Sequence, residues 1–139
     1  MEPTAEVTVG GRRPLSVPTD PERVDGLPLE TTTFSIRCAT GEHERGRWLG
    51  VPIADVLEAA DVAPTTTHLL ATAADGHRAC LELRPALSGL LGLRREDVPG
   101  DTPRLLADVA GARTVRRVVD LEPRRLSPVE DPTELETVG

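Results

Sequence analysis

The stretch FSIRCATGEHERGRWLGVPIADVL, residues 34–57, decides the fold, because it joins a strand ending in a cysteine to an amphipathic helix. Phe34, Ile36 and Cys38 alternate with polar residues, which is the period of a half-buried strand. The apolar residues between positions 53 and 60 recur at helical spacing. We therefore expect Cys38 to end the strand beside a loop, a position from which a thiolate can bind a metal.

The residues between this strand and this helix favour binding over core packing. Two glycines, His43, Arg45, Arg47 and Trp48 follow Cys38 within a few positions, a composition suited to an anion or an electron-rich cofactor. We interpret the segment as a loop. A lone cysteine is also typical of a small buried hydrophobe, so both interpretations of Cys38 remain open at this point.

Length and composition indicate one acidic domain. A chain of 139 residues is long enough to bury a core of its own. We expect a single domain over residues 1–126 and an acidic, proline-bearing flexible tail over residues 127–139.

The charge pattern excludes a general nucleic-acid surface. All 16 basic residues are arginines, 23 residues are acidic, the net charge is −7, and lysine, asparagine, glutamine and tyrosine are absent from the sequence. This alphabet indicates a GC-rich genome and an acidic surface of the halophilic type. Nucleic-acid binding needs clustered basic residues that displace counterions, so we expect no nucleic-acid partner.

The cysteine usage and the apolar runs favour a reduced, cytoplasmic protein. Cys38 and Cys80 form no CxxC pair and no zinc-finger spacing, and no haem or iron–sulfur pattern identifies an electron partner. No run approaches the roughly 18 apolar residues of a membrane span. We therefore expect cytoplasmic localisation without a membrane span.

The remaining elements predict a mixed α+β fold rather than a doubly wound sheet, because strands and helices do not alternate regularly. Asp75 and Gly76 indicate a hairpin. We expect strands at 5–9, 15–17, 31–38, 67–72, 78–83, 105–106 and 118–123, helices from Pro52 and over 85–93, and a turn or short helix at 111–117.

Read in order, these pieces resemble the molybdopterin-binding domain of the sulfite oxidase family. The resemblance extends over residues 31–122. It rests on Cys38, WLGVPI at 48–53, DVL at 55–57, Asp75 and Gly76 before LEL at 81–83, Ala86 and Leu87, and GARTVR at 111–116. It implies a mixed sheet with short helices and the molybdenum cofactor, molybdopterin.

The resemblance also implies roles for individual residues. The family's metal-binding thiolate corresponds to Cys38, a soft ligand suited to molybdenum, and positive charge from Arg37 favours the thiolate. We assign His43, in the following loop, to cofactor binding as well. In the family a G-x-P-x-R motif and a G-A-R-x-V-K motif hold the anionic pterin phosphate and the substrate oxyanion. Here they correspond to Gly100 and Arg104, with Thr102 in place of proline, and to Gly111, Arg113 and Arg116, with arginine in place of lysine.

Several departures from the family pattern concern activity. His77 stands where the family has its active-site tyrosine, and it is either a proton or hydrogen-bond donor or an exposed hairpin residue. The segments that precede the first arginine motif in the family are replaced by LRREDVPGD at 93–101, and the region before Cys38 is shorter.

Three functions remain open on the sequence. The first is a molybdopterin-dependent oxidoreductase or cofactor-binding subunit that, if active, transfers an oxygen atom to or from a small anionic substrate. The second is a cofactor-free interaction module that retains the fold. The third is a Cys/His metal site built from Cys38, His43 and His77. The sequence does not identify the substrate, the electron-transfer partner or the oligomeric state.

Overall fold

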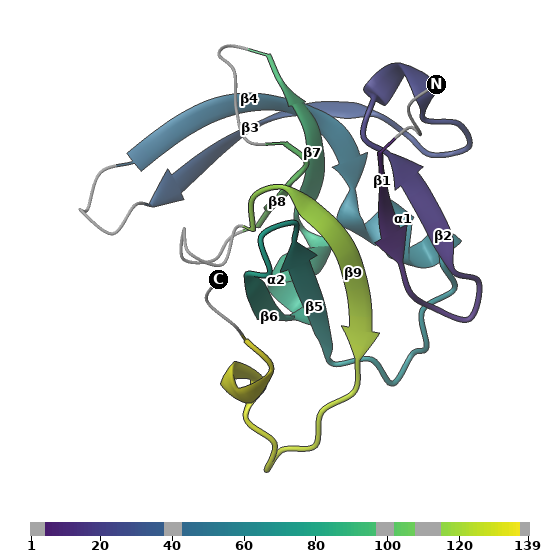
Figure 1. The fold of residues 1–139 in the computed structure, drawn as a ribbon, viewed down its shortest axis with the longest axis vertical. Helices are drawn as coiled ribbons and strands as arrows, with labels where there is room; N and C mark the ends of the chain where they lie inside the picture. Colours follow the sequence, from purple (N-terminus) through teal and green to yellow (C-terminus); the bar gives the residue numbers. More distant parts are fainter. Residues whose placement is uncertain (1–4, 38–42, 97–101, 108–114, 137–139) are drawn as a thin grey trace.

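Two β-sheets and two short helices form the body of the protein (Figure 1). The computed structural model describes residues 5–37, 43–96, 102–107 and 115–136. The strands are β1 (Glu6–Val9), β2 (Leu15–Pro18), β3 (Glu30–Arg37), β4 (His43–Pro52), β5 (His68–Ala73), β6 (Arg78–Glu82), β7 (Leu90–Arg95), β8 (Arg104–Leu106) and β9 (Val118–Arg124). The helices are α1 (Ile53–Ala59) and α2 (Leu83–Leu87), with 3-10 turns η1 (Pro21–Arg23) and η3 (Pro132–Leu135).

The five-stranded sheet has the order β2-β1-β9-β5-β6. β1 and β2 form an antiparallel hairpin, as do β5 and β6. β9 lies between the two hairpins, parallel to β1 and antiparallel to β5. The sheet is therefore complete only when the last strand of the chain is in place.

The four-stranded sheet has the order β3-β4-β7-β8, and all its neighbours are antiparallel. β3 and β4 pair from Glu30 and Gly50 to Arg37 and His43, which makes a long hairpin that extends away from the body (Figure 1). A register shift falls between Leu49 and Gly50, where β4 pairs with β7.

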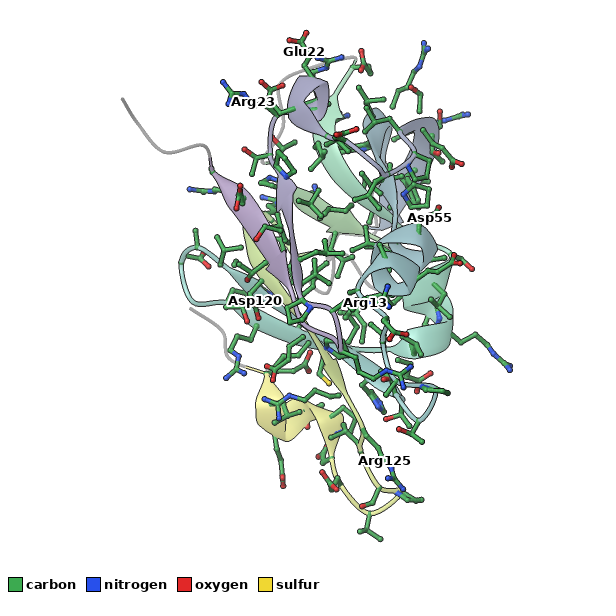
Figure 2. All side chains as sticks on the ribbon, turned by 90° about the vertical axis from the view of Figure 1, so that its right-hand side faces the viewer. Arg13, Glu22, Arg23, Asp55, Asp120 and Arg125 are labelled. Carbon is green, nitrogen blue, oxygen red and sulfur yellow. The ribbon has the colours of Figure 1, made fainter. Side chains whose placement is uncertain are left out.

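The main core lies on one face of each sheet and under α1. The five-stranded sheet contributes residues such as Leu69, Leu81 and Leu121, and the four-stranded sheet contributes Leu91 and Leu105, all of them fully or almost fully buried. Figure 2 shows both helices on one side of the molecule.

A second, smaller apolar cluster consists of Trp48, Leu90 and Leu106, with Phe34 packed against it. Leu90 and Leu106 alternate with Leu91 and Leu105 of the main core, so the two clusters occupy opposite faces of β7 and β8. This part of the four-stranded sheet is consequently buried on both faces.

The predicted loop after Cys38 was wrong for residues 43–50, which belong to strand β4. Gly46 and Trp48 are buried while Arg45 and Arg47 are exposed, which is the alternation of a half-buried strand. The pattern was hidden in the sequence because a glycine stands at one of the buried positions.

The predicted helix over 85–93 was also wrong in extent, since α2 ends at Leu87 and residues 90–95 form β7. The run LLGL is buried on both faces, and such a run does not distinguish helix from strand by its period. Gly89 marks the change, because a Cβ there would lie 2.2 Å from the carbonyl oxygen of Leu106.

The other main expectations are confirmed. The structure contains both predicted hairpins, a helix directly after Pro52, a strand at 104–106 and the last strand at 118–124. The segment expected as a flexible tail contains η3, and the structure describes it as far as Glu136. No helix in the described part of the chain has both the length and the apolar character of a membrane span.

Candidate functional site

Among the residues that the structure describes, Arg104 is the charged residue that is buried. It lies at the start of β8 with 4% of its surface exposed, opposite Gly92 of β7. A guanidinium group remains charged in proteins, and burying a charge is unfavourable unless acceptors or an anion surround it. The position of Arg104 in the fold therefore suits contact with an anion.

Arg116 faces Arg104 across an isolated antiparallel bridge. The backbone fixes this arrangement, because the N–H of Leu105 donates to the carbonyl of Val115 at 3.0 Å and the N–H of Val118 donates to that of Pro103 at 2.9 Å. Arg116 itself is exposed. The structure thus brings together two arginines that are 12 positions apart in the sequence, one buried and one at the surface.

The turn that carries His77 is attached to the same segment. The N–H of Ala74 donates to the carbonyl of Arg117 at 2.9 Å, directly after Arg116 in the chain. Within the turn, the N–H of His77 donates to Asp75 Oδ1 at 3.0 Å and its carbonyl accepts from Ala73 at 2.8 Å. His77 is half-buried, and its turn is bonded through Ala74 to the residue that follows Arg116 in the chain.

Arg37 and His43 form the last backbone pair at the end of the β3–β4 hairpin. Gly50 of β4 pairs with Gly92 of β7, which in turn pairs with Arg104 of β8. His43 lies seven residues before Gly50, which is about 23 Å along β4 at the usual rise of about 3.3 Å per residue. The predicted site residues therefore fall into two groups, one at the hairpin end and one at its base. Cys38, Gly100, Gly111 and Arg113 lie outside the described residues.

Arg95 is a site candidate that the sequence did not reveal. Its guanidinium lies 5.5 Å from the centroid of the Trp48 ring and its Nη2 donates to the carbonyl of Arg45 at 3.1 Å. It lies on β7 between the two groups of predicted residues. No local pattern marks Arg95, because the register shift at Leu49 and Gly50 determines which β7 residue faces Trp48.

Trp48 is buried rather than placed in an open loop. Its ring is 1% exposed, and its Nε1 has no hydrogen-bond partner among the residues that the structure describes. Gly46 leaves room for this contact, since a Cβ there would lie 2.8 Å from Trp48 Nε1 and 2.8 Å from Arg95 Nε. Trp48 and Arg95 thus connect the hairpin to β7 through their side chains.

The described residues contain no group of three or more His, Cys, Asp or Glu side chains able to hold a metal ion. His43 lies on the four-stranded sheet and His77 in a turn of the five-stranded sheet. Cys38 is outside the described residues, so its predicted role as a metal ligand remains a prediction.

The sequence of this chain matches no protein-family model and no curated protein. Its structure is similar to a chain of the sulfane dehydrogenase SoxCD from Paracoccus pantotrophus, with a TM-score of 0.75 and 18% sequence identity. The similarity covers 94% of this chain and 41% of that chain, so this chain spans less than half the length of its structural neighbour. The predicted fold class is confirmed, because the fold is α+β, with mixed sheets and short helices.

Proposed function

We propose that this chain is a molybdopterin-binding-domain protein of the sulfite oxidase type. Cys38 is the metal ligand, and Arg104, Arg113 and Arg116 contact the anionic part of the pterin. The similarity to the fold of sulfane dehydrogenase SoxCD supports this assignment at the level of the fold. Arg104 and Arg116 support it chemically, because arginine side chains bind phosphate groups.

The observation that carries the proposal is the bridge between Arg104 and Arg116. An arginine fork matches the geometry of a phosphate, and two arginines at paired backbone positions suit contact with one anion. Arg104 is almost fully buried, which suits a site that holds an anion away from water.

The strand that precedes Cys38 ends at the far end of the β3–β4 hairpin (Figure 1). The arginine pair favours molybdopterin over the simple Cys/His metal site, because a pterin cofactor has a phosphate that two arginines can bind and a single metal ion has none.

The residues of the chain bind and orient, while the cofactor, when bound, supplies two-electron oxygen-atom transfer. Arg37 and His43 are the proposed cofactor-binding residues at the end of the hairpin, and the charge of Arg37 would favour the Cys38 thiolate. His77, which stands where the family has a tyrosine, is the proposed hydrogen-bond or proton donor.

Cofactor retention tests the arginine pair. We would purify Arg104→Gln and, as a matched control, Arg125→Gln, which changes an exposed arginine beyond β9. Pterin released by oxidation is measured by its fluorescence. The proposal predicts at least a tenfold loss of pterin in Arg104→Gln and no loss in Arg125→Gln. Equal pterin content in both variants would contradict the assignment of Arg104.

A cofactor-free interaction module is the second candidate. It is favoured by the departures from the family pattern within the chain, LRREDVPGD at 93–101 and His77 in place of a tyrosine. For such a module, Cys38→Ser would leave both stability and partner binding unchanged, and the purified protein would contain no pterin.

A further inference from the structure

β6 is an edge strand of the five-stranded sheet, and alternate backbone groups along it point away from β5. The carbonyl of His77 accepts from Ala73 and the N–H of Leu83 donates to Thr67, so the odd-numbered residues of this strand bond to β5. The backbone groups of Arg78, Cys80 and Glu82 therefore point away from β5, to the outer edge of the sheet. An exposed row of such groups is a template for pairing with another strand.

The C-terminal segment, residues 127–136, covers this edge. The N–H of Cys80 donates to Glu136 Oε2 at 3.0 Å, so a side-chain carboxylate takes the position of a neighbouring strand's carbonyl. The 3-10 turn η3 lies beside β6, drawn in yellow in Figure 1.

Two apolar residues outside the main core are also buried in this region. Ala79 and Leu81 belong to the main core, so Cys80 and its β5 partner Leu70 lie on the opposite face of the sheet, and both are only 1% exposed. Because η3 contacts β6, we expect release of the C-terminal segment to expose apolar surface of β6 as well as backbone donors and acceptors.

The cover itself is lightly built. Its turn is capped by Asp131, whose Oδ1 accepts from the N–H of Thr133 at 2.9 Å, and Val129 is 94% exposed. Few buried groups hold such a segment, which is typical of elements that open locally at low free energy.

We propose that the edge of β6 is a self-association surface, and that residues 127–136 are the removable cover that keeps it closed. The partner is a second copy of this chain, paired antiparallel through β6. The sequence of the strand supports this partner, because a two-fold pairing centred on Cys80 places Arg78 of each copy opposite Glu82 of the other. The carbonyl of Cys80 in the second copy then replaces the carboxylate of Glu136.

This register makes a specific geometric prediction. Because the N–H and the carbonyl of Cys80 both point outward, the two Cys80 residues form a hydrogen-bonded antiparallel pair with Cα atoms about 5.5 Å apart. That separation is within the range that a disulfide spans. Diamide oxidises the two thiols to a disulfide and takes up the two hydrogens, so it traps the dimer covalently.

The experiment uses the full chain with Cys38→Ser, which leaves Cys80 as the only cysteine. In this background, Glu136→Arg places a donor against the Cys80 N–H and releases the cover, and Glu136→Ala is a milder version. Glu136→Gln keeps an acceptor oxygen and is the matched control. Molar mass is measured by light scattering, and cross-linking by non-reducing gels after diamide. Fluorescence of Trp48, the single tryptophan, confirms that each variant is folded.

The proposal predicts a dimer and a cross-link in Glu136→Arg, a weaker form of both in Glu136→Ala, and a monomer in Glu136→Gln. Arg78→Glu added to Glu136→Arg should weaken association at least tenfold, and Glu82→Arg added to that variant should restore it. A monomer in both folded release variants would overturn the proposal. A dimer that is unaffected by the charge changes, or not cross-linked through Cys80, would overturn it equally.

Discussion

Arg104 on β8 and Arg116 face each other across an antiparallel bridge, with Arg104 almost fully buried and Arg116 exposed. The pairing joins two arginines that family resemblance assigns to separate motifs. Two arginines at paired positions suit contact with one anion, so the role of Arg104 is tested by binding.

Arg95→Met should lower the free energy of unfolding by about 0.5–1 kcal/mol, because it removes the contact of the guanidinium with Trp48. The neighbouring Arg94→Met is the control. Arg94 pairs with Glu96 at 3.2 Å through a side chain that is 49% exposed, and such surface pairs contribute little. The emission maximum of Trp48 should shift in Arg95→Met alone. Equal effects of the two substitutions on stability and emission would rule out a specific contribution of Arg95.

Gly50→Ala should destabilise the four-stranded sheet by about 3 kcal/mol, because the new Cβ would lie 2.1 Å from the carbonyl oxygen of Leu91 and the backbone has to move. Gly10→Ala is the comparison, since the nearest atom there is a side-chain carbon at 3.3 Å. Thermal unfolding of the two variants should show a much larger fall in Tm for Gly50→Ala. Similar Tm values would show that β4 and β7 are not packed as closely as described.

The turn at the start of η3 should depend on pH through Asp131. A side-chain hydrogen bond and a backbone hydrogen bond from Thr133 lower the pKa of Asp131 below its usual 3.8. Because the folded-state pKa is depressed, the stabilisation of the turn is present above about 3.8 and is lost as the pH falls through the lower folded-state value.

An NMR titration of the Asp131 side-chain carbonyl carbon measures this effect. Thr133→Val, which removes the hydroxyl donor, should move the Asp131 pKa upward toward 3.8, whereas substitution of the distant Thr8 should not. An Asp131 pKa that does not change in Thr133→Val would show that the hydroxyl does not stabilise the carboxylate.

Periodicity predicted those parts of the fold whose local pattern matches their environment. Helix α1 and the hairpin β1–β2 each have one buried and one exposed face. In the hairpin β5–β6, Asp75 and Gly76 mark the turn between the paired strands. β4 and β7 were missed for different reasons. Glycines at 46 and 50 hide the buried face of β4, and β7 is covered on both faces, so neither strand shows its true period in the sequence.

Sequence motifs predicted residues of the candidate site, but they did not predict which of these residues contact one another. The sequence indicated Arg104 and Arg116 separately, yet their pairing depends on how the chain returns from β8 to β9. The contact of Arg95 with Trp48 was not predictable, because it depends on the register shift between Leu49 and Gly50, and no sequence pattern predicts that shift. The roles of Cys38, Arg37, His43, Gly111, Arg113 and His77 stay predictions.

The metal content of the protein purified from its native host tests the central proposal most directly. Elemental analysis should find molybdenum, or tungsten in its place, in proportion to the protein, and Cys38→Ser should lose it while remaining folded by Trp48 fluorescence. A folded native protein that contains neither metal, or a Cys38→Ser variant that retains the metal in full, would contradict the proposal that Cys38 binds molybdenum.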